Sequence, residues 1–116
     1  MTTIAENTGL VTLINVFTVD PSNQQQLVDL LAHATETTVR DVPGFVSAAL
    51  HRGVDGTKVT MYSQWESAAH YRHYPSMLSK PDAAPYVGQV LAIATFEPGM
   101  YEVARVFAGP AQSDAR

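Results

Sequence analysis

Aromatic side chains that also carry a hydrogen-bonding atom are concentrated between residues 61 and 74, in the stretch MYSQWESAAHYRHY. This stretch contains Trp65, the only tryptophan of the chain, and Tyr71. Both residue types combine a large apolar surface with one polar atom, which suits a flat aromatic ligand that carries phenolic oxygens. The two rings could wall one pocket if the chain turns at Ser67 and the next helix folds back. The competing interpretation is structural, because a single tryptophan is more often a core side chain.

Two further polar side chains are candidates for the same chemistry. His51 ends a predicted strand on the same side as Phe45 and Ala49. A neutral imidazole there could relay a proton near pH 7, or could simply be hydrogen-bonded at the rim. Asn15 lies in an apolar first strand, where an amide needs a partner. It is either a hydrogen-bonded core residue or a donor to a pocket, and the sequence leaves both interpretations open.

Metal, nucleotide and flavin sites are not indicated by any spacing in the chain. His70 and His73 share a helix face and could in principle bind a metal. Only Glu66 stands near them at ligand spacing, so we interpret this face as solvated. Cysteine is absent, which excludes thiolate ligands and cysteine nucleophiles and fits a reducing cytoplasm. The scattered glycines form no phosphate-binding loop.

Length and composition limit the remaining possibilities. The 116 residues suffice for one domain with one core, and 46% of them are hydrophobic. Seven basic against eleven acidic residues give a net charge of −4 without a basic stripe, which argues against nucleic-acid binding. No signal peptide or membrane-spanning segment is predicted. We expect a disordered or extended start over 1–9, one domain over 10–108 and a flexible tail over 109–116.

The elements that must position these side chains follow a β-α-β-β-α-α-β order. Strands are predicted over residues 10–19, 45–52, 57–66 and 99–107 from their β-branched and aromatic content. Helices are predicted over residues 22–39, over residues 67–74 and from Asp82 through Ala94. Asp20 and Pro21 give the first helix a strong N-terminal signal. This order is the split β-α-β pattern of a ferredoxin-like α+β domain, an antiparallel sheet with helices on one face.

Both faces of this sheet are predicted to be apolar. Alternation over residues 57–66 directs Met61 and Trp65 to one face and Tyr62 to the other, and residues 99–107 are apolar on both faces as well. One chain has helices for only one face. A second copy that packs its sheet on the bare face, as an isologous dimer, is the expected solution, and a curled monomeric sheet is the alternative.

The segment DVPGFVSAALHRGVDGTKVTMYSQWESAAHYR, residues 41–72, resembles the antibiotic biosynthesis monooxygenase family. The likeness is greatest to the cofactor-free, quinone-forming monooxygenases of aromatic polyketide pathways, the actinorhodin type. The VPGF turn, His51 and the QWES…YR segment carry the resemblance, which covers about residues 10–75. It implies a dimeric α+β barrel that oxidises a polycyclic phenol or anthrone to a quinone with molecular oxygen and no cofactor. The deprotonated substrate would itself reduce oxygen in a dry pocket.

The resemblance also implies roles for individual residues. Trp65 and Tyr71 match the family's active-site tryptophan and tyrosine: the indole would bind the ring system and donate its N–H to a developing oxyanion, and the phenol would help to move the substrate's proton. His51 matches a histidine of the polyketide enzymes and is the third catalytic candidate. The expected substrate-binding residues are Asn15, Met61, Tyr62 and Tyr86.

Two positions depart from the family pattern. Met61 stands on the third strand where the actinorhodin-type enzymes have a pocket asparagine, and a thioether cannot stabilise an anion. The family's active-site arginine has no clear counterpart, with Lys80 the nearest basic residue. Asn15 or His51 could replace these groups, the chain could act on a different substrate, or it could have lost the chemistry.

Two other functions fit the same fold. A non-catalytic protein could hold an aromatic polyketide in the same pocket or assist a cyclase, and Met61 favours this alternative. A haem-degrading enzyme would pair a first-strand asparagine, as Asn15, with an iron-binding histidine near Ala83 or Ala84, where this chain has none. Oxygen uptake with an anthrone tests the first alternative, and a haemin titration tests the second.

Overall fold

A computed structural model of the chain describes residues 2–70 and 84–110. The elements, in chain order, are β1 (Val11–Val19), a 3-10 turn (Pro21–Asn23), α1 (Gln24–Thr37), a second 3-10 turn (Val39–Asp41), β2 (Phe45–Arg52), β3 (Lys58–Trp65), α3 (Ala84–Ile93) and β4 (Ala94–Tyr101). Residues 68–70 are helical, and Ser67 caps them by accepting a hydrogen bond from the backbone N–H of His70 at 3.2 Å. The predicted continuation of this helix to residue 74 and the predicted cap at Asp82 lie outside the described residues.

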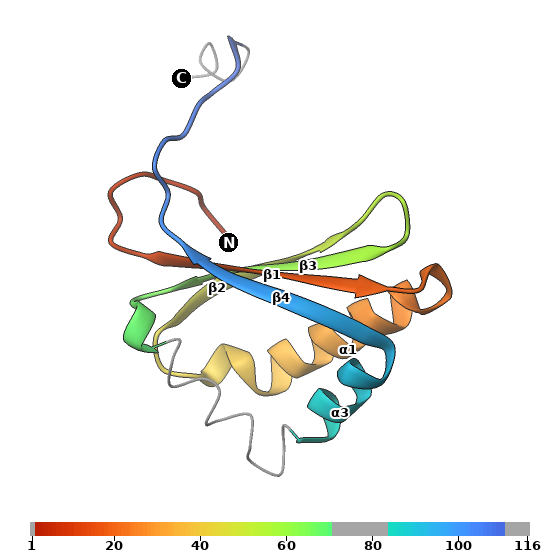
Figure 1. Ribbon diagram of the computed structural model, residues 1–116. Coiled ribbons are helices and arrows are strands. Elements are labelled where there is room, and N and C mark those ends of the chain that lie inside the picture. The colour runs from red at the N-terminus through yellow and green to blue at the C-terminus, as the bar shows by residue number, and fades with distance from the viewer. Residues whose placement is uncertain (1, 71–83, 111–116) are drawn as a thin grey trace.

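The strands form one antiparallel sheet in the order β2-β3-β1-β4, and α1 and α3 lie on one face of it (Figure 1). This arrangement confirms the predicted ferredoxin-like α+β fold. The pairing of β1 with β3 places Asn15 opposite Met61 and Leu13 opposite Ser63. Because side chains alternate along a strand, all four of these side chains lie on the helix side of the sheet.

The first helix begins close to its predicted position, after a short 3-10 turn. Asp20 accepts hydrogen bonds from the backbone N–H of Ser22 at 3.0 Å and from its hydroxyl at 2.7 Å, and Pro21 presets the backbone of the first turn. Leu27 on the buried side of α1 is fully buried. The predicted apolar stripe therefore faces the sheet. Among the described residues, no helix is long and apolar enough to cross a membrane.

Buried side chains between the sheet and the helices form two groups. The larger group joins both helices to three of the strands and consists of Phe17, Val19, Leu27, Val59, Val90 and Ala94. The smaller group surrounds the tryptophan and consists of Leu13, Val39, Val42 and Trp65. Members of both groups line the same cavity, which therefore lies where the two groups meet.

The last strand lies earlier in the chain than the sequence predicts. The prediction placed this strand at residues 99–107 and continued the preceding helix through Ala94, whereas α3 ends at Ile93 and β4 runs from Ala94 to Tyr101. Pro98 and Gly99 argued against a strand here, because both residue types are depleted in strands. They are accommodated because β4 is an edge strand that pairs only with β1.

An irregularity near the start of β2 reverses the predicted orientation of its later residues. The register shifts just after Phe45, which lies opposite Trp65, and both Phe45 and Ala48 line the helix side. Alternation then directs Ala49 and His51 to the other face. The prediction that Phe45, Ala49 and His51 share one face is therefore wrong.

The face of the sheet away from the helices is only partly covered. Residues before β1 cross it, where the side-chain amide of Gln64 donates to the carbonyl oxygen of Thr3 at 2.7 Å. After β4 the chain leaves the sheet on this side and extends away from it (Figure 1). Tyr101, Val106 and Phe107 are exposed by 54%, 42% and 78%. The described part of one chain therefore leaves apolar surface uncovered on this side.

Candidate active site

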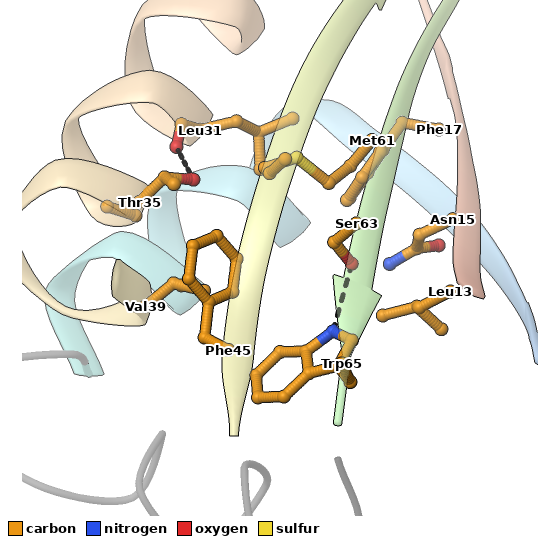
Figure 2. A pocket seen from close by; sticks show the side chains of 12 residues that line it. Leu13, Asn15, Phe17, Leu31, Thr35, Val39, Phe45, Met61, Ser63 and Trp65 are labelled. Atoms are coloured by element: carbon orange, nitrogen blue, oxygen red, sulfur yellow. Dashed lines mark hydrogen bonds between the residues drawn. The ribbon is translucent and has the colours of Figure 1, made fainter. Parts of the chain in front are cut away.

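A cavity of about 80 Å³ lies between the helix side of the sheet and α1, with Phe45 and Trp65 at one end (Figure 2). A single ordered water needs roughly 10–15 Å³ of such space, so the cavity has room for a considerably larger group. It is lined by Leu13, Asn15, Phe17, Leu31, Ala34, Thr35, Val39, Phe45, Ala48, Met61, Ser63 and Trp65. None of these twelve side chains is ionisable, so the described lining suits an uncharged apolar ligand.

Trp65 forms one end of the cavity and is almost completely buried, with 1% of its surface exposed. It is the last residue of β3, where alternation directs it to the helix side together with Met61 and Ser63. Phe45 on the neighbouring strand meets the indole edge-on, with 5.5 Å between the ring centroids and 81° between the ring planes. Cross-strand pairing of these two rings therefore builds an aromatic end to the cavity.

The indole N–H of Trp65 donates to the hydroxyl oxygen of Ser63 at 3.0 Å, as the dashed line in Figure 2 shows. Donation of this N–H to a ligand oxyanion, the role that the resemblance implies, stays a prediction. Ser63 is 3% exposed and accepts the indole proton, which leaves its own hydroxyl hydrogen for another acceptor. Alternation along β3 places Ser63 on the same face as Trp65, but no motif in the sequence marks Ser63 as a site residue.

Asn15 presents an unsatisfied polar atom in this apolar setting. Its side-chain oxygen, Oδ1, is buried and has no hydrogen-bond partner, and it is the only such side-chain atom among the described residues. Leaving a polar group buried without a partner costs about 1–3 kcal/mol. The Asn15 oxygen is therefore not that of a hydrogen-bonded core amide in this structure, and a role of Asn15 in ligand binding stays a prediction.

The helix wall of the cavity offers no comparable polar atom among its described residues. The hydroxyl of Thr35 on α1 donates to the backbone carbonyl of Leu31 at 2.7 Å, a bond within the same helix. The other α1 residues of the lining, Leu31 and Ala34, are apolar. The polar atoms available to a ligand therefore lie on the sheet wall, at Asn15 and Ser63.

Several predicted site residues lie elsewhere. Tyr62 and His51 point to the face of the sheet away from the helices, opposite Ile14 and Thr60 respectively. Tyr86 on α3 packs edge-on against His33 of α1, with 5.1 Å between ring centroids, and does not line the cavity. The structure thus brings Trp65, Asn15 and Met61 together and leaves Tyr62, Tyr86 and His51 apart from them. Tyr71, His73 and Lys80 lie outside the described residues.

Among the described residues, the titratable groups with shifted pKa values do not belong to the cavity. Hydrogen bonds from Ser22 lower the pKa of the Asp20 carboxyl, and hydrogen bonds from Thr57 lower that of Asp55, both at exposed turns. Within residues 2–70 and 84–110, no three His, Cys, Asp or Glu side chains lie close enough to hold a metal. The described lining can therefore bind and orient a ligand through an amide and a hydroxyl.

The chain is similar to known proteins over most of its length. The model of the family described as antibiotic biosynthesis monooxygenase matches residues 10–76. Tetracenomycin-F1 monooxygenase of Streptomyces glaucescens is 38% identical over 107 residues, which cover 92% of this chain and 93% of that protein.

Solved structures agree with this assignment. A monooxygenase from the gene ActVA-Orf6 of Streptomyces coelicolor, in complex with nanaomycin D, is 28% identical with a TM-score of 0.70, covering 85% of this chain and 91% of that chain. An asparagine-to-alanine mutant of SnoaB, a cofactor-independent oxygenase from Streptomyces nogalater, is 23% identical with a TM-score of 0.68, covering 88% and 100%. This last likeness concerns the fold alone. The family match and the tetracenomycin-F1 relative show that the chain belongs to the antibiotic biosynthesis monooxygenase family.

Proposed function

We propose that this chain is a cofactor-independent monooxygenase that oxidises a polycyclic phenol or anthrone to a quinone with molecular oxygen. The observation that carries the proposal is the cavity beside Trp65, which is apolar on its helix side and has its available polar atoms on the sheet. Such a site fits a flat ring system with oxygen substituents along one edge. Similarity to tetracenomycin-F1 monooxygenase and to the ActVA-Orf6 monooxygenase supports the same activity.

In this reaction the substrate supplies the electrons. An anthrone loses a proton from its central methylene carbon, and the resulting anion passes one electron to oxygen. The substrate radical and superoxide then join at that carbon as a peroxide, which loses water and leaves the quinone carbonyl. One oxygen atom ends in the product and the other in water. An apolar cavity assists by excluding bulk water and by strengthening hydrogen bonds to the anion.

The protein's role is to bind the ring system of the substrate and to assist the transfer of one proton from it. Trp65 and Phe45, with 5.5 Å between their centroids, offer aromatic surface against which a planar substrate can pack. Tyr71 is proposed, on the family resemblance, to hydrogen-bond the substrate phenol and exchange its proton. The hydrogen bond from Trp65 to Ser63 fixes the indole in place before the substrate arrives.

Oxygen uptake by EDTA-treated protein, with dithranol or emodin anthrone as substrate, tests the proposal. We expect quinone to form with one oxygen molecule consumed per substrate, and we expect Trp65→Phe and Tyr71→Phe each to slow turnover at least tenfold. Tyr86→Phe is the matched control, because it removes the same hydroxyl from a ring that does not line the cavity. Normal turnover in both site variants would contradict the assigned site, and tight binding without turnover would assign the chain a non-catalytic role.

We also propose that the protein acts as a homodimer whose two sheets pack through the faces away from the helices. Support comes from the apolar surface on that side, where Tyr101 is 54% exposed at the edge of the sheet and Phe107 is 78% exposed beyond it. A second copy would cover this surface. The absence of cysteine is compatible with the cytoplasmic location that we propose as well.

A further inference from the structure

Two polar side chains lie on the sheet wall of the cavity, whose other polar side chain, Thr35, is hydrogen-bonded within α1. Asn15 lies opposite Met61 and Leu13 lies opposite Ser63, so Asn15 and Ser63 are diagonal neighbours on adjacent strands. Diagonal neighbours have Cα atoms roughly 7–8 Å apart, and their side chains can reach a common partner. Figure 2 shows both side chains on this wall, above Trp65.

The two groups offer opposite halves of a hydrogen-bonding pattern. The Asn15 oxygen Oδ1 is buried and accepts from no group, so it can accept a hydrogen bond from a ligand hydroxyl. The Ser63 oxygen already accepts from the indole N–H at 3.0 Å, so its own O–H can donate to a ligand. A hydroxyl that already accepts one hydrogen bond is also polarised toward donating another.

We propose that Asn15 and Ser63 together select a ligand edge on which a hydroxyl stands beside a carbonyl or phenolate oxygen. Ser63 donates to the carbonyl or phenolate oxygen, and Asn15 accepts from the neighbouring hydroxyl. The ligand class is a hydroxylated polycyclic aromatic ketone, bound with this edge against the sheet and its unsubstituted rings against α1. The inference rests on the proposed function for the ring system, and it adds the residues that determine which ring substituents are accepted.

A purely structural role does not account for Asn15. A core amide is retained for the hydrogen bonds that it makes, and the oxygen of this one makes none within the described residues. Leucine has the same branching and the same number of side-chain heavy atoms, and it would place no buried polar atom at this position. Retaining an unpaired acceptor in an apolar wall gives discrimination, because a ligand that lacks the matching hydroxyl leaves the acceptor unpaired.

Binding of three anthraquinones tests the inference without turnover: anthraquinone and its 1-hydroxy and 2-hydroxy derivatives. These compounds are already oxidised, so they cannot undergo the proposed oxygenation, and quenching of the fluorescence of the single tryptophan reports their binding. We expect the wild type to bind 1-hydroxyanthraquinone, whose hydroxyl stands beside a carbonyl, about tenfold more tightly than anthraquinone or the 2-hydroxy isomer. Asn15→Leu should abolish this preference, leave the affinity for anthraquinone unchanged and keep the melting temperature at least as high.

Two further variants separate the two contacts. Ser63→Ala should lower the affinity for all three compounds, because each of them carries the carbonyl to which Ser63 is proposed to donate. Thr35→Val is the matched control: it also removes a cavity hydroxyl, but this hydroxyl donates to the backbone carbonyl of Leu31, so the preference should persist.

Each outcome bears on the inference. A hydroxyl preference that survives in Asn15→Leu, a wild type that binds none of the three compounds, or a marked loss of thermal stability in Asn15→Leu would overturn it. The two proposals can also fail separately. If the wild type never oxidises an anthrone but its hydroxyl preference is lost in Asn15→Leu, this inference is supported and the proposed oxygenation is refuted.

Discussion

The two faces of the sheet differ in how completely one chain covers them. On the helix side, Leu13, Phe17 and Trp65 are only 5%, 6% and 1% exposed, and they surround a defined cavity. On the other side, Val16 remains partly exposed in the middle of β1, although residues near the N-terminus cross part of this face. The middle of β1 is thus covered more completely on the helix side than on the other side.

This difference shows how alternate residues of one strand can serve ligand binding on one face of the sheet and assembly on the other. Asn15 lines the cavity, and its chain neighbour Val16 belongs to the face for which we propose a second copy. A step of one residue along β1 therefore moves a substitution from ligand recognition to assembly. Substitutions at such neighbouring positions can therefore separate the two faces.

The largest effect is expected on the helix side, from Trp65→Ala. This change removes a side chain that is 1% exposed and packs edge-on against Phe45, so it would leave a large void in the group of buried side chains around Trp65. We expect the free energy of unfolding to fall by about 3–5 kcal/mol, measured by urea denaturation. Val46→Ala on the neighbouring strand is the control, since Val46 is 44% exposed and should change stability by no more than about 0.5 kcal/mol. A loss below 1 kcal/mol for Trp65→Ala would show that the indole is not integral to the core.

On the uncovered face, Val16→Lys should separate assembly from folding. Val16 lies opposite Glu97 of β4, so a lysine there gains a cross-strand partner within the monomer, while a charge is placed in the proposed interface. We expect the dimer dissociation constant to rise at least about 100-fold, measured by light scattering across a dilution series, with an unchanged circular dichroism spectrum. Asn15→Leu, one residue away on the cavity side, should leave the dimer intact. A wild-type protein that is monomeric at all concentrations would refute the proposed assembly.

A smaller effect is expected at the start of α1, the helix that covers the cavity side of the sheet. Hydrogen bonds from Ser22 lower the pKa of the Asp20 carboxyl below its ordinary value of 3.8. Because the folded-state pKa is the lower one, the stabilisation is fully present above pH 3.8 and is lost as the pH falls through the folded value. Asp20→Ala should therefore lower the melting temperature by a few degrees at pH 7 and by less near pH 3.

Asp29→Ala serves as the comparison for Asp20, because it removes the same charge from the interior of α1, where no turn depends on it. Its effect on the melting temperature should be smaller at pH 7. An Asp20→Ala deficit of equal size at both pH values would mean that the carboxylate is not the source of the stabilisation.

The fold followed from the sequence because most of its elements have strong local patterns. Strict alternation in β3 placed Met61, Ser63 and Trp65 on one face, and the Asp20-Pro21 signal placed the start of the first helix near its observed position. The exceptions are features of strand pairing. The irregularity after Phe45 depends on how β2 meets β3, and a strand through Pro98 is tolerated only because β4 is at the edge.

The site was predictable in its composition but less so in its hydrogen bonding. Trp65, Asn15 and Met61 do line one cavity, and the register adds that Asn15 lies directly across from Met61, the position at which the related enzymes are expected to carry an amide. An amide thus enters the same region from the neighbouring strand. The partner of the indole N–H and the unpaired oxygen of Asn15 depend on side-chain positions across strands, which no linear pattern encodes.

The smallest expected effect is at His51, where the resemblance implied a catalytic role and the structure places the side chain on the face away from the cavity. His51→Ala should change the rate of quinone formation less than twofold, because its side chain and the cavity are on opposite sides of the sheet. Ser63→Ala, on the adjacent strand but on the cavity side, should slow the reaction by a much larger factor under the same conditions. A tenfold loss in His51→Ala without a change in oligomeric state would mean that the imidazole acts on the substrate after all. The proposal that one face of the sheet binds the substrate and the other forms the dimer would then be wrong, since a residue on the face away from the helices would contribute to the chemistry.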